Sequence, residues 1–121
     1  MTLLLLKTSG QTIDQVVKNA KHATNTQPNA TVGDLILIAQ TKTTLKPGQK
    51  SIRYVMTYKG SRLDTGSESV KIWGKKWKYM IDGYDVIQIP GFNIKDVQAT
   101  KKNYDPIVTH CRLKPEDEQQ S

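Results

Sequence analysis

Leu3-Leu-Leu-Leu6 followed by Lys7-Thr-Ser-Gly10 is a short apolar run that stops at polar and turn-forming residues. A continuous apolar run of this length is typical of a strand buried on both faces of a sheet. Further along the chain, Gly33-Asp34 introduces a second such run, Leu35-Ile-Leu-Ile-Ala39. Residues 52–58 alternate instead, which predicts a strand with one apolar face. That face holds Ile52, Tyr54, Met56 and Tyr58.

Between the two apolar runs the hydrophobic period changes to that of a helix. Thr12 and Gln15 have the spacing of a capping box, so we expect a helix from about residue 12 to about residue 24. The segment 25–31 is polar and contains Pro28, which predicts a loop. The apolar stripe of the expected helix comprises Ile13, Val16, Val17, Ala20 and Ala23.

The second half of the chain predicts short strands joined by turns. Val70–Trp73 and Trp77–Ile81 flank the turn-like Gly74-Lys-Lys76 and are strand candidates. Asp82-Gly83 is a strong hairpin signal, and Tyr84–Ile89 is the expected return strand.

The remaining segments complete a small α+β pattern. Asn93–Gln98 is expected to form a helical turn, and Ile107–Leu113 a last strand. One helix and about six short strands favour a curled sheet or small β-barrel, with the N-terminal helix covering one opening. A single domain over residues 1–114 fits the length of 121 residues, with an acidic flexible tail at residues 115–121.

The composition is that of an ordinary folded protein rather than a disordered or disulfide-built one. Hydrophobic residues make up 36% and charged residues 24% of the chain. A single cysteine excludes an internal disulfide and a cysteine-rich zinc site. The opening apolar run is too short for a signal peptide or a bilayer span. We therefore expect a cytoplasmic protein without a membrane anchor.

The net charge of +7 is concentrated in the middle of the chain. Residues 42–78 contain ten cationic side chains and two carboxylates, Asp64 and Glu68. If the loops that carry these cations share one rim, they can neutralise several phosphates of a nucleic acid. A solvated lysine-rich surface agrees equally well with the charge alone. The cations are Lys42, Lys46, Lys50, Arg53, Lys59, Arg62, Lys71, Lys75, Lys76 and Lys78.

Aromatic residues are interleaved with this charge. Trp73-Gly-Lys-Lys-Trp77-Lys-Tyr79 places two indoles and a phenol among three lysines. A base stacks on an aromatic face while neighbouring cations hold the backbone, which favours a nucleic-acid site. The alternative is that these aromatic residues are core material, since the chain has one Phe. We expect one tryptophan in the core and one at a pocket, and the sequence does not decide which.

Catalytic and cofactor motifs are missing from the sequence. It has no close pair of histidines or carboxylates, no glycine-rich phosphate loop and no nucleophile elbow. We therefore expect no cofactor, no metal and no enzymatic activity. Cys111 lies between His110 and Arg112, but strand alternation places its thiol on the opposite face. We interpret Cys111 as a buried structural thiol, and Asp82 and Asp85 as turn residues.

The order of these features along the chain is itself informative. Lys7-Thr-Ser9 ends the first strand, a helix follows, and Gly33-Asp34 leads an apolar strand. An alternating strand, a tryptophan-containing segment and a closing strand near Leu113 come next. This order resembles the PUA-like superfamily and, within it, the EVE and YTH-like domains, in which a small curled β-barrel carries a helix near its N-terminus. The resemblance covers nearly the whole chain through short motifs.

The resemblance implies a module that binds nucleic acid and no membrane. Such domains hold a nucleobase, often a modified one, in an aromatic-lined pocket beside a basic surface. The base comes from single-stranded RNA or DNA, or is flipped out of a duplex. By position, the first three pocket residues would lie at its mouth and the aromatic ones would form stacking walls. The implied pocket residues are Lys7, Thr8, Ser9, Trp73, Trp77 and Tyr79, and the implied phosphate contacts are Lys42, Lys46, Lys75, Lys76 and Lys78.

Two other functions stay open. The ASCH branch of the same superfamily includes small amidohydrolases of acylated pyrimidine nucleosides, which rely on Lys, Thr and Glu. Lys21-x-x-Thr24, or Lys7-Thr8, offers the first two, and Glu68 is the one glutamate before the tail. The other possibility is a basic interaction module that docks on an acidic protein. The sequence predicts neither the oligomeric state nor the choice between RNA and DNA.

Overall fold

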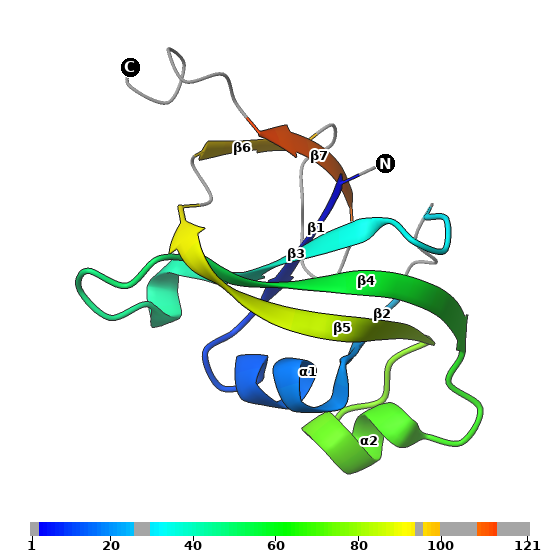
Figure 1. Ribbon diagram of the computed structural model, residues 1–121. Coiled ribbons are helices and arrows are strands. Elements are labelled where there is room, and N and C mark those ends of the chain that lie inside the picture. The colour runs from blue at the N-terminus through cyan, green and yellow to red at the C-terminus, as the bar shows by residue number, and fades with distance from the viewer. Residues whose placement is uncertain (1–2, 26–29, 94–95, 100–108, 114–121) are drawn as a thin grey trace.

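The computed structural model describes residues 3–25, 30–93, 96–99 and 109–113, which form seven strands, two α-helices and a 3₁₀ turn (Figure 1). The strands pair in one mixed sheet, and the result is a small α+β fold. In chain order the elements are β1 (Leu3–Thr8), α1 (Ile13–Asn19), β2 (Lys21–Thr24), β3 (Leu35–Gln40), the 3₁₀ turn η1 (Lys42–Thr44), β4 (Ile52–Leu63), α2 (Glu68–Trp73), β5 (Tyr79–Phe92), β6 (Val97–Ala99) and β7 (Thr109–Leu113). The order across the sheet is β2-β5-β4-β3-β1-β7-β6.

The two apolar runs of the sequence are neighbouring strands inside the sheet. β1 and β3 pair in parallel, with Leu3 opposite Leu35 and Thr8 opposite Gln40. Strands with apolar layers on both faces bury successive residues rather than alternate ones, and both strands do so. The prediction of two fully buried strands is therefore confirmed.

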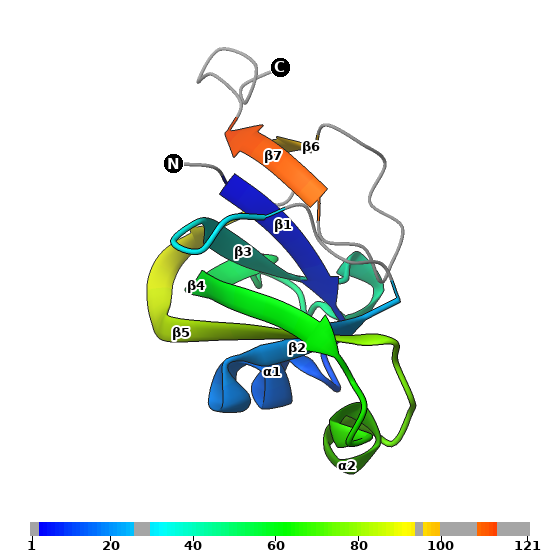
Figure 2. The same ribbon diagram turned by 90° about the vertical axis from the view of Figure 1, so that its right-hand side faces the viewer.

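The two faces of these strands belong to separate clusters of buried side chains. α1 and α2 lie together at one end of the molecule, and β6 and β7 at the other (Figure 2). Cys111 lies in the second cluster, where burial raises the pKa of its thiol to about 11. The first cluster comprises Leu4, Leu6, Ile13, Val16, Ile36, Ile38, Met56, Tyr58 and Ile81. The second comprises Leu5, Leu37, Ala39, Ile52, Val97 and Cys111.

The first helix is shorter than its hydrophobic period predicts. α1 ends at Asn19, because Ala20 is left-handed (φ 52°) and its N–H donates to the carbonyl of Val16. The chain then forms β2, which pairs antiparallel with β5. The expected helix over residues 12–24 is therefore wrong beyond residue 19. Ala23 keeps the helical spacing, but it is buried as a strand residue.

The start of α1 also differs from the prediction. Thr12 and Gln15 do not form a capping box, since no side chain caps the helix. The Thr12 hydroxyl instead donates to the carbonyl oxygen of Ser9, at 3.2 Å. This bond holds Thr12 against the loop that joins β1 to α1.

Val70–Trp73, predicted as a strand, forms most of α2. The carboxylate of Asp64 fixes the start of this helix by accepting hydrogen bonds from the N–H groups of Glu68 (2.7 Å) and Ser69 (3.1 Å). Gly74, which is left-handed (φ 75°), ends it. A short run with few apolar residues does not distinguish a helical turn from a strand, so the hydrophobic pattern was ambiguous here.

Asp82-Gly83 is not a hairpin turn. It lies inside β5, which pairs with β4 along its length and with β2 near its start. Gly83 serves a close approach of the two strands, since a Cβ there would lie 2.7 Å from Met56 Sδ and 3.1 Å from the carbonyl oxygen of Thr57. Most of Trp77–Ile81 and all of Tyr84–Ile89 therefore belong to one continuous strand rather than two.

The alternating segment is a strand, as predicted, but β4 is longer and irregular. It extends to Leu63, and its register with β5 shifts between Ile52 and Tyr54. A bulge of this kind turns the residues on its two sides toward opposite faces. Ile52 accordingly packs in the second cluster, whereas Met56 and Tyr58 pack in the first. The predicted common face is therefore wrong for Ile52.

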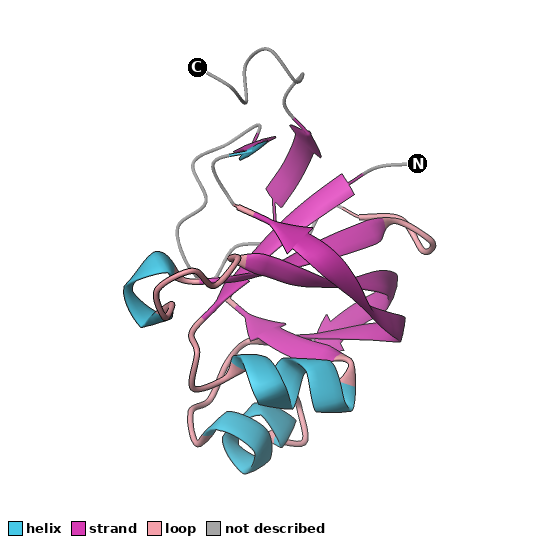
Figure 3. Cartoon of the chain, turned by 60° about the vertical axis from the view of Figure 1, so that its left-hand side comes forward, coloured by secondary structure: helices cyan, strands magenta, loops and turns pink. Residues whose placement is uncertain are grey.

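The sheet is open in the residues that the structure describes. β2 and β6 are its edge strands, and the described residues show no pairing between them. The predicted barrel is not confirmed (Figure 3). Seven strands pair in the sheet, against the six or so expected. The helical turn expected over Asn93–Gln98 is confirmed in part, since the N–H of Asp96 donates to the carbonyl of Asn93 at 2.9 Å, and β6 begins directly after it at Val97. Ile107 and the acidic tail at residues 115–121 lie outside the described residues. Within the described ranges, no helix is long and apolar enough to cross a bilayer.

Candidate functional site

A cavity of about 210 Å³ lies among three segments that are distant in sequence. They are the β1–α1 loop with the last residue of β1, the middle of β2, and the stretch from the end of α2 to Trp77. We call this cavity the aromatic pocket. Its lining consists of Thr8, Ser9, Thr12, His22, Ala23, Trp73, Lys75 and Trp77.

Three hydroxyl groups form one wall of the aromatic pocket. Ser9 Oγ lies 3.1 Å from Thr12 Oγ1, and Thr8 Oγ1 also forms a hydrogen bond with Thr12 Oγ1. The bond from Thr12 to the Ser9 carbonyl ties the three together. Because the Thr12 hydroxyl donates to the Ser9 carbonyl, the Thr8 and Ser9 hydroxyls donate to Thr12, and this wall offers hydroxyl oxygens that can accept bonds from a ligand.

Two indole rings and an ammonium group form another wall. Trp73 packs against the first core cluster, whereas Trp77 carries Lys75, whose Nζ lies 4.5 Å from the indole centroid. A lysine in this position is attracted by the electron-rich face of the ring. Trp73 thus packs on the core and Trp77 does not, as expected, but both rings line the pocket, so the two roles overlap at Trp73.

His22 is a neutral, polar residue in this pocket. Burial lowers the pKa of its imidazole to about 4, so the ring is uncharged near neutral pH. It meets Trp73 edge to face, with ring centroids 6.0 Å apart and an interplanar angle of 78°. His22 Nδ1 and Trp73 Nε1 are buried, and neither has a hydrogen-bond partner among the described residues. Each buried polar atom without a partner costs about 1–3 kcal/mol.

A buried polar chain outside the pocket positions Trp77. The N–H of Trp77 donates to Ser69 Oγ at 3.0 Å, and this hydroxyl donates in turn to Asp64. Lys76 Nζ donates to the main-chain carbonyl of Asp64 and lies 3.5 Å from its carboxylate. The segment 75–77 is thereby fastened to the start of α2.

The carboxylate of Asp64 is ionised near neutral pH and well below it. Burial acts to raise its pKa, but the hydrogen bonds from Ser69 and Glu68 and the charge of Lys76 outweigh burial and lower it to about 2. The side chain is 3% exposed and accepts bonds from several donors, which is the usual condition for a buried carboxylate. Its role is structural, because it does not line the pocket.

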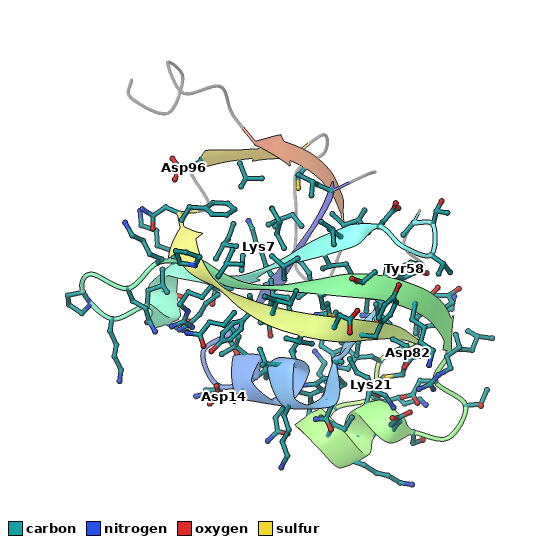
Figure 4. The ribbon with its side chains drawn as sticks, in the orientation of Figure 1. Lys7, Asp14, Lys21, Tyr58, Asp82 and Asp96 are labelled. Carbon is teal, nitrogen blue, oxygen red and sulfur yellow. The ribbon has the colours of Figure 1, made fainter. Side chains whose placement is uncertain are left out.

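Four charged residues next to this region link β2, β4, β5 and α2. Lys21 Nζ lies 2.5 Å from Glu68 Oε1, and Arg62 Nη2 lies 2.7 Å from Glu68 Oε2. Arg62 also binds Asp82 through Nε at 3.0 Å. Lys21 and Asp82 are opposite each other on β2 and β5 and lie close to α2 (Figure 4). Hydrogen bonds from Lys21 and Arg62 lower the pKa of Glu68. Asp82 is thus an ion-pair residue of a strand rather than a turn residue.

The structure brings together part of the pocket that the sequence predicted. Thr8, Ser9, Trp73 and Trp77 line it, whereas Lys7 and Tyr79 do not. Lys7 precedes Thr8 on a strand, so its side chain leaves β1 on the other face. Tyr79 begins β5 between Thr24 and Leu63, and Lys78 Nζ lies 5.4 Å from its ring.

The predicted phosphate contacts do not form one group around the pocket. Among them Lys75 alone lines it. Lys76 is bound to Asp64, Lys78 lies over Tyr79, and Lys42 is exposed in η1. Lys46 lines a different cavity, described below. The loops and strand ends that carry these cations therefore do not share the single rim on which the predicted phosphate collar depends.

Four polar residues of the region were missed from the sequence. Thr12 was assigned to a helix cap and His22 to a helix that ends before it, so neither could be placed in a pocket. Asp64 and Ser69 precede the expected strand at Val70 and were given no role. The one available signal was the pair Asp64 and Ser69 itself, since both residue types often begin helices. In the described ranges, no three His, Cys, Asp or Glu side chains cluster as metal ligands do.

Comparison with known proteins does not identify a family. No protein-family model matches the chain, and no curated protein matches it either.

Proposed function

We propose that this protein is a nucleic-acid-binding module that holds a single nucleobase in the aromatic pocket. The observation that carries the proposal is the combination of two indoles, three hydroxyls and a neutral imidazole around one cavity. A flat heteroaromatic ring needs a stacking surface and hydrogen-bonding groups at its edge, and this lining offers both. We further propose that the chain is a PUA-like domain of the EVE or YTH-like type, with a sheet that curls toward a barrel.

The size of the pocket favours a base rather than a larger molecule. Its volume is about 210 Å³, whereas sites for drug-sized ligands measure roughly 300–1,000 Å³. A nucleobase fits such a space with its sugar and phosphates outside. The ligand is therefore a base from a single strand, or one flipped out of a duplex, of RNA or DNA.

Each wall of the pocket has a distinct task in this proposal. Trp77 is the stacking surface, because its ring is not committed to the core and carries a cation that suits the neighbouring phosphate. Stacking of a base on such a ring contributes about 1–3 kcal/mol. His22 and the hydroxyls of Ser9 and Thr12 meet the polar edge of the base and select among bases.

Tryptophan fluorescence tests the proposal directly. Wild-type protein is titrated with nucleosides, plain and base-methylated, and with short single strands at two salt concentrations. We expect saturable quenching that depends on the base and persists at the higher salt concentration. Trp77→Ala should weaken binding about 5- to 150-fold, the equivalent of about 1–3 kcal/mol. Trp77→Phe is the matched control, since it keeps an aromatic face and should retain part of the affinity.

Two results would contradict base binding in the aromatic pocket. One is equal affinity of the wild type and Trp77→Ala for the same strand. The other is quenching by every strand alike that disappears at higher salt, which indicates binding by charge alone.

The contact between Lys21 and Glu68 favours a second candidate function, a small amidohydrolase of modified nucleosides. Resemblance to the ASCH branch pairs these two residues with Thr24, and the 2.5 Å ion pair places two of the three together. Against it, Thr24 is fully buried and none of the three lines the pocket. Release of acetate from N4-acetylcytidine by the wild type, lost in Lys21→Met, would establish this activity. No release under saturating substrate would exclude it.

A further inference from the structure

A second cavity lies across the β1–α1 loop from the aromatic pocket. It measures about 450 Å³, and its lining includes Gly10, Gln40, Thr44, Lys46 and Arg53. The loop contributes to both cavities, with Ser9 and Thr12 lining the aromatic pocket and Gly10 and Gln11 lining the second cavity. We call this second cavity the arginine pocket.

Arg53 is the unusual residue of the arginine pocket. Its Nη2 donates to the side-chain oxygen of Gln40 at 2.5 Å, and its guanidinium lies 5.8 Å from the centroid of Tyr54. Its Nε is buried and has no hydrogen-bond partner among the described residues. The ion pairs of the described residues include none with Arg53. Gln40 accepts one of the five N–H bonds that a guanidinium can donate, and Arg53 lines the cavity, so its outer Nη donors form a site for an anion.

The surroundings hold this guanidinium in place. Gln40 is 5% exposed, and its Nε2 donates to the carbonyl of Thr44 at 2.9 Å, which directs its oxygen to Arg53. Gly10 packs directly on this amide, since a Cβ on Gly10 would lie 2.7 Å from Gln40 Nε2. The N–H of Gly10 donates to Thr44 Oγ1 at 3.0 Å. Burial of a glutamine amide to orient an arginine preorganises a binding group rather than an internal ion pair.

We propose that the arginine pocket binds a phosphate group, with Arg53 as its main ligand and Lys46 as the second cation. The fork of a guanidinium matches the oxygen spacing of phosphate and forms two parallel hydrogen bonds with it. Asp14 is the one carboxylate in the lining, so the described side chains of the cavity carry two positive charges and one negative charge. The excess is one positive charge, which the single negative charge of a phosphodiester in a nucleic-acid strand balances.

This inference rests on the proposed function where it names the source of the phosphate. If a base occupies the aromatic pocket, the sugar–phosphate backbone of its nucleic-acid strand runs either across the β1–α1 loop or away from it. A strand that crosses the loop places a neighbouring phosphate in the arginine pocket. The strand is then held on both sides of residues 9–12, by stacking on one side and by charge on the other.

Chemical-shift titration of the full chain with inorganic phosphate tests the phosphate site by itself. We expect saturable shifts of the Gly10 and Thr44 amides and of the Arg53 Nε–H, weaker with acetate. Arg53→Gln should abolish them, and Arg53→Lys should restore part of the affinity because it keeps the charge without the fork. Asp14→Asn should tighten binding several-fold, a gain that damage to the fold cannot mimic. Absence of these shifts in the wild type, or their persistence in Arg53→Gln, overturns the proposal.

A second titration, with a nucleoside and a short single strand, distinguishes the two sources of phosphate. Arg53→Gln should leave nucleoside affinity unchanged, weaken strand affinity about tenfold and lower the salt slope by about 1. Trp77→Ala should weaken both ligands. If inorganic phosphate binds but nucleosides do not, the phosphate site stands and the base pocket falls. If nucleosides bind and Arg53→Gln has no effect on the strand, the base pocket stands and the strand path over the loop falls.

Discussion

The main-chain N–H of Trp77 donates to the hydroxyl of Ser69 at 3.0 Å, across eight residues of chain. Ser69 is fully buried and passes the connection on to Asp64. The position of the exposed aromatic face in the pocket thus depends on a hydroxyl that no ligand touches. This relationship allows the pocket to be loosened without any change to its lining.

Ser69→Ala should therefore weaken ligand binding and stability together. It leaves the Trp77 N–H without its acceptor and removes one of the bonds that Asp64 Oδ2 accepts, at a cost of about 1–3 kcal/mol in the free energy of unfolding. We expect red-shifted tryptophan emission and a lower denaturation midpoint in urea. Thr65→Ala, an exposed change in the same loop, is the control and should match the wild type. Identical emission and midpoint for Ser69→Ala would show that the bond does not hold the loop.

His22 should make stability fall as the pH falls. The pKa of the imidazole is about 4 in the folded protein, against about 6.5 when the chain is unfolded. The unfolded chain therefore binds more protons between these two values, and stability decreases as the pH falls from about 6.5 toward 4. The full effect at pH 4 is about 3 kcal/mol. It is absent above pH 7.

Urea denaturation of the wild type and His22→Gln at a series of pH values measures this effect. The difference between their unfolding free energies should change in the window from 6.5 to 4 and stay constant above 7. A constant difference across the whole range would mean that His22 is not buried in its neutral form.

The two tryptophans should separate stability from binding. Trp73 packs against the first core cluster, so Trp73→Ala should lower the unfolding free energy by about 3 kcal/mol. Trp77 is not part of either cluster, so Trp77→Ala should cost about 1 kcal/mol or less in stability while it weakens base binding. Thermal unfolding of both variants, compared with the wild type, measures the two losses of stability. Equal destabilisation would place Trp77 in the core as well.

Gly83 should not tolerate a side chain, although it lies in a strand. Its Cβ would contact Met56 Sδ and the carbonyl oxygen of Thr57, so Gly83→Ala should destabilise the fold by about 1–3 kcal/mol. Gly66→Ala is the matched control, because nothing lies within 4 Å of a Cβ there. Calorimetric unfolding of the two variants compares them. An unchanged midpoint for Gly83→Ala would indicate that the strands are further apart than described.

The elements that local composition determines were predictable from the sequence. β1 and β3 are continuous apolar runs between clear breaks, and such runs have one stable placement, inside a sheet. The end of α1 was not predictable in this way. The apolar spacing of the helix continues through Ala23, and the conformation of Ala20 that stops the helix depends on pairing of β2 with a strand some sixty residues later.

Pocket residues that follow a recognisable strand, or that are conspicuous by residue type, were predictable from the sequence. Residues that reach the pocket only through pairing of distant strands were not. Thr8 and Ser9 follow β1 directly, and Trp73 and Trp77 are conspicuous by type. His22 enters the pocket because β2 exists, and Arg53 is oriented by Gln40, thirteen residues earlier. Such neighbours are set by tertiary contacts, which a pattern of hydrophobicity does not contain.

The burial of Cys111 gives this protein an internal probe of its own motion. Cys111 pairs with Leu3 of β1 and Ala99 of β6, its side chain packs in the second cluster, and the thiol pKa of about 11 keeps it protonated. A thiol reagent can therefore label the folded chain through transient detachment of β7, and the labelling rate reports the free energy of that opening. Since the chain has one cysteine, the signal needs no engineered site. The labelling rate of Cys111 reports opening at the end of the molecule opposite α1 and α2. A slower rate with a ligand in either pocket would therefore show that binding stabilises the whole sheet.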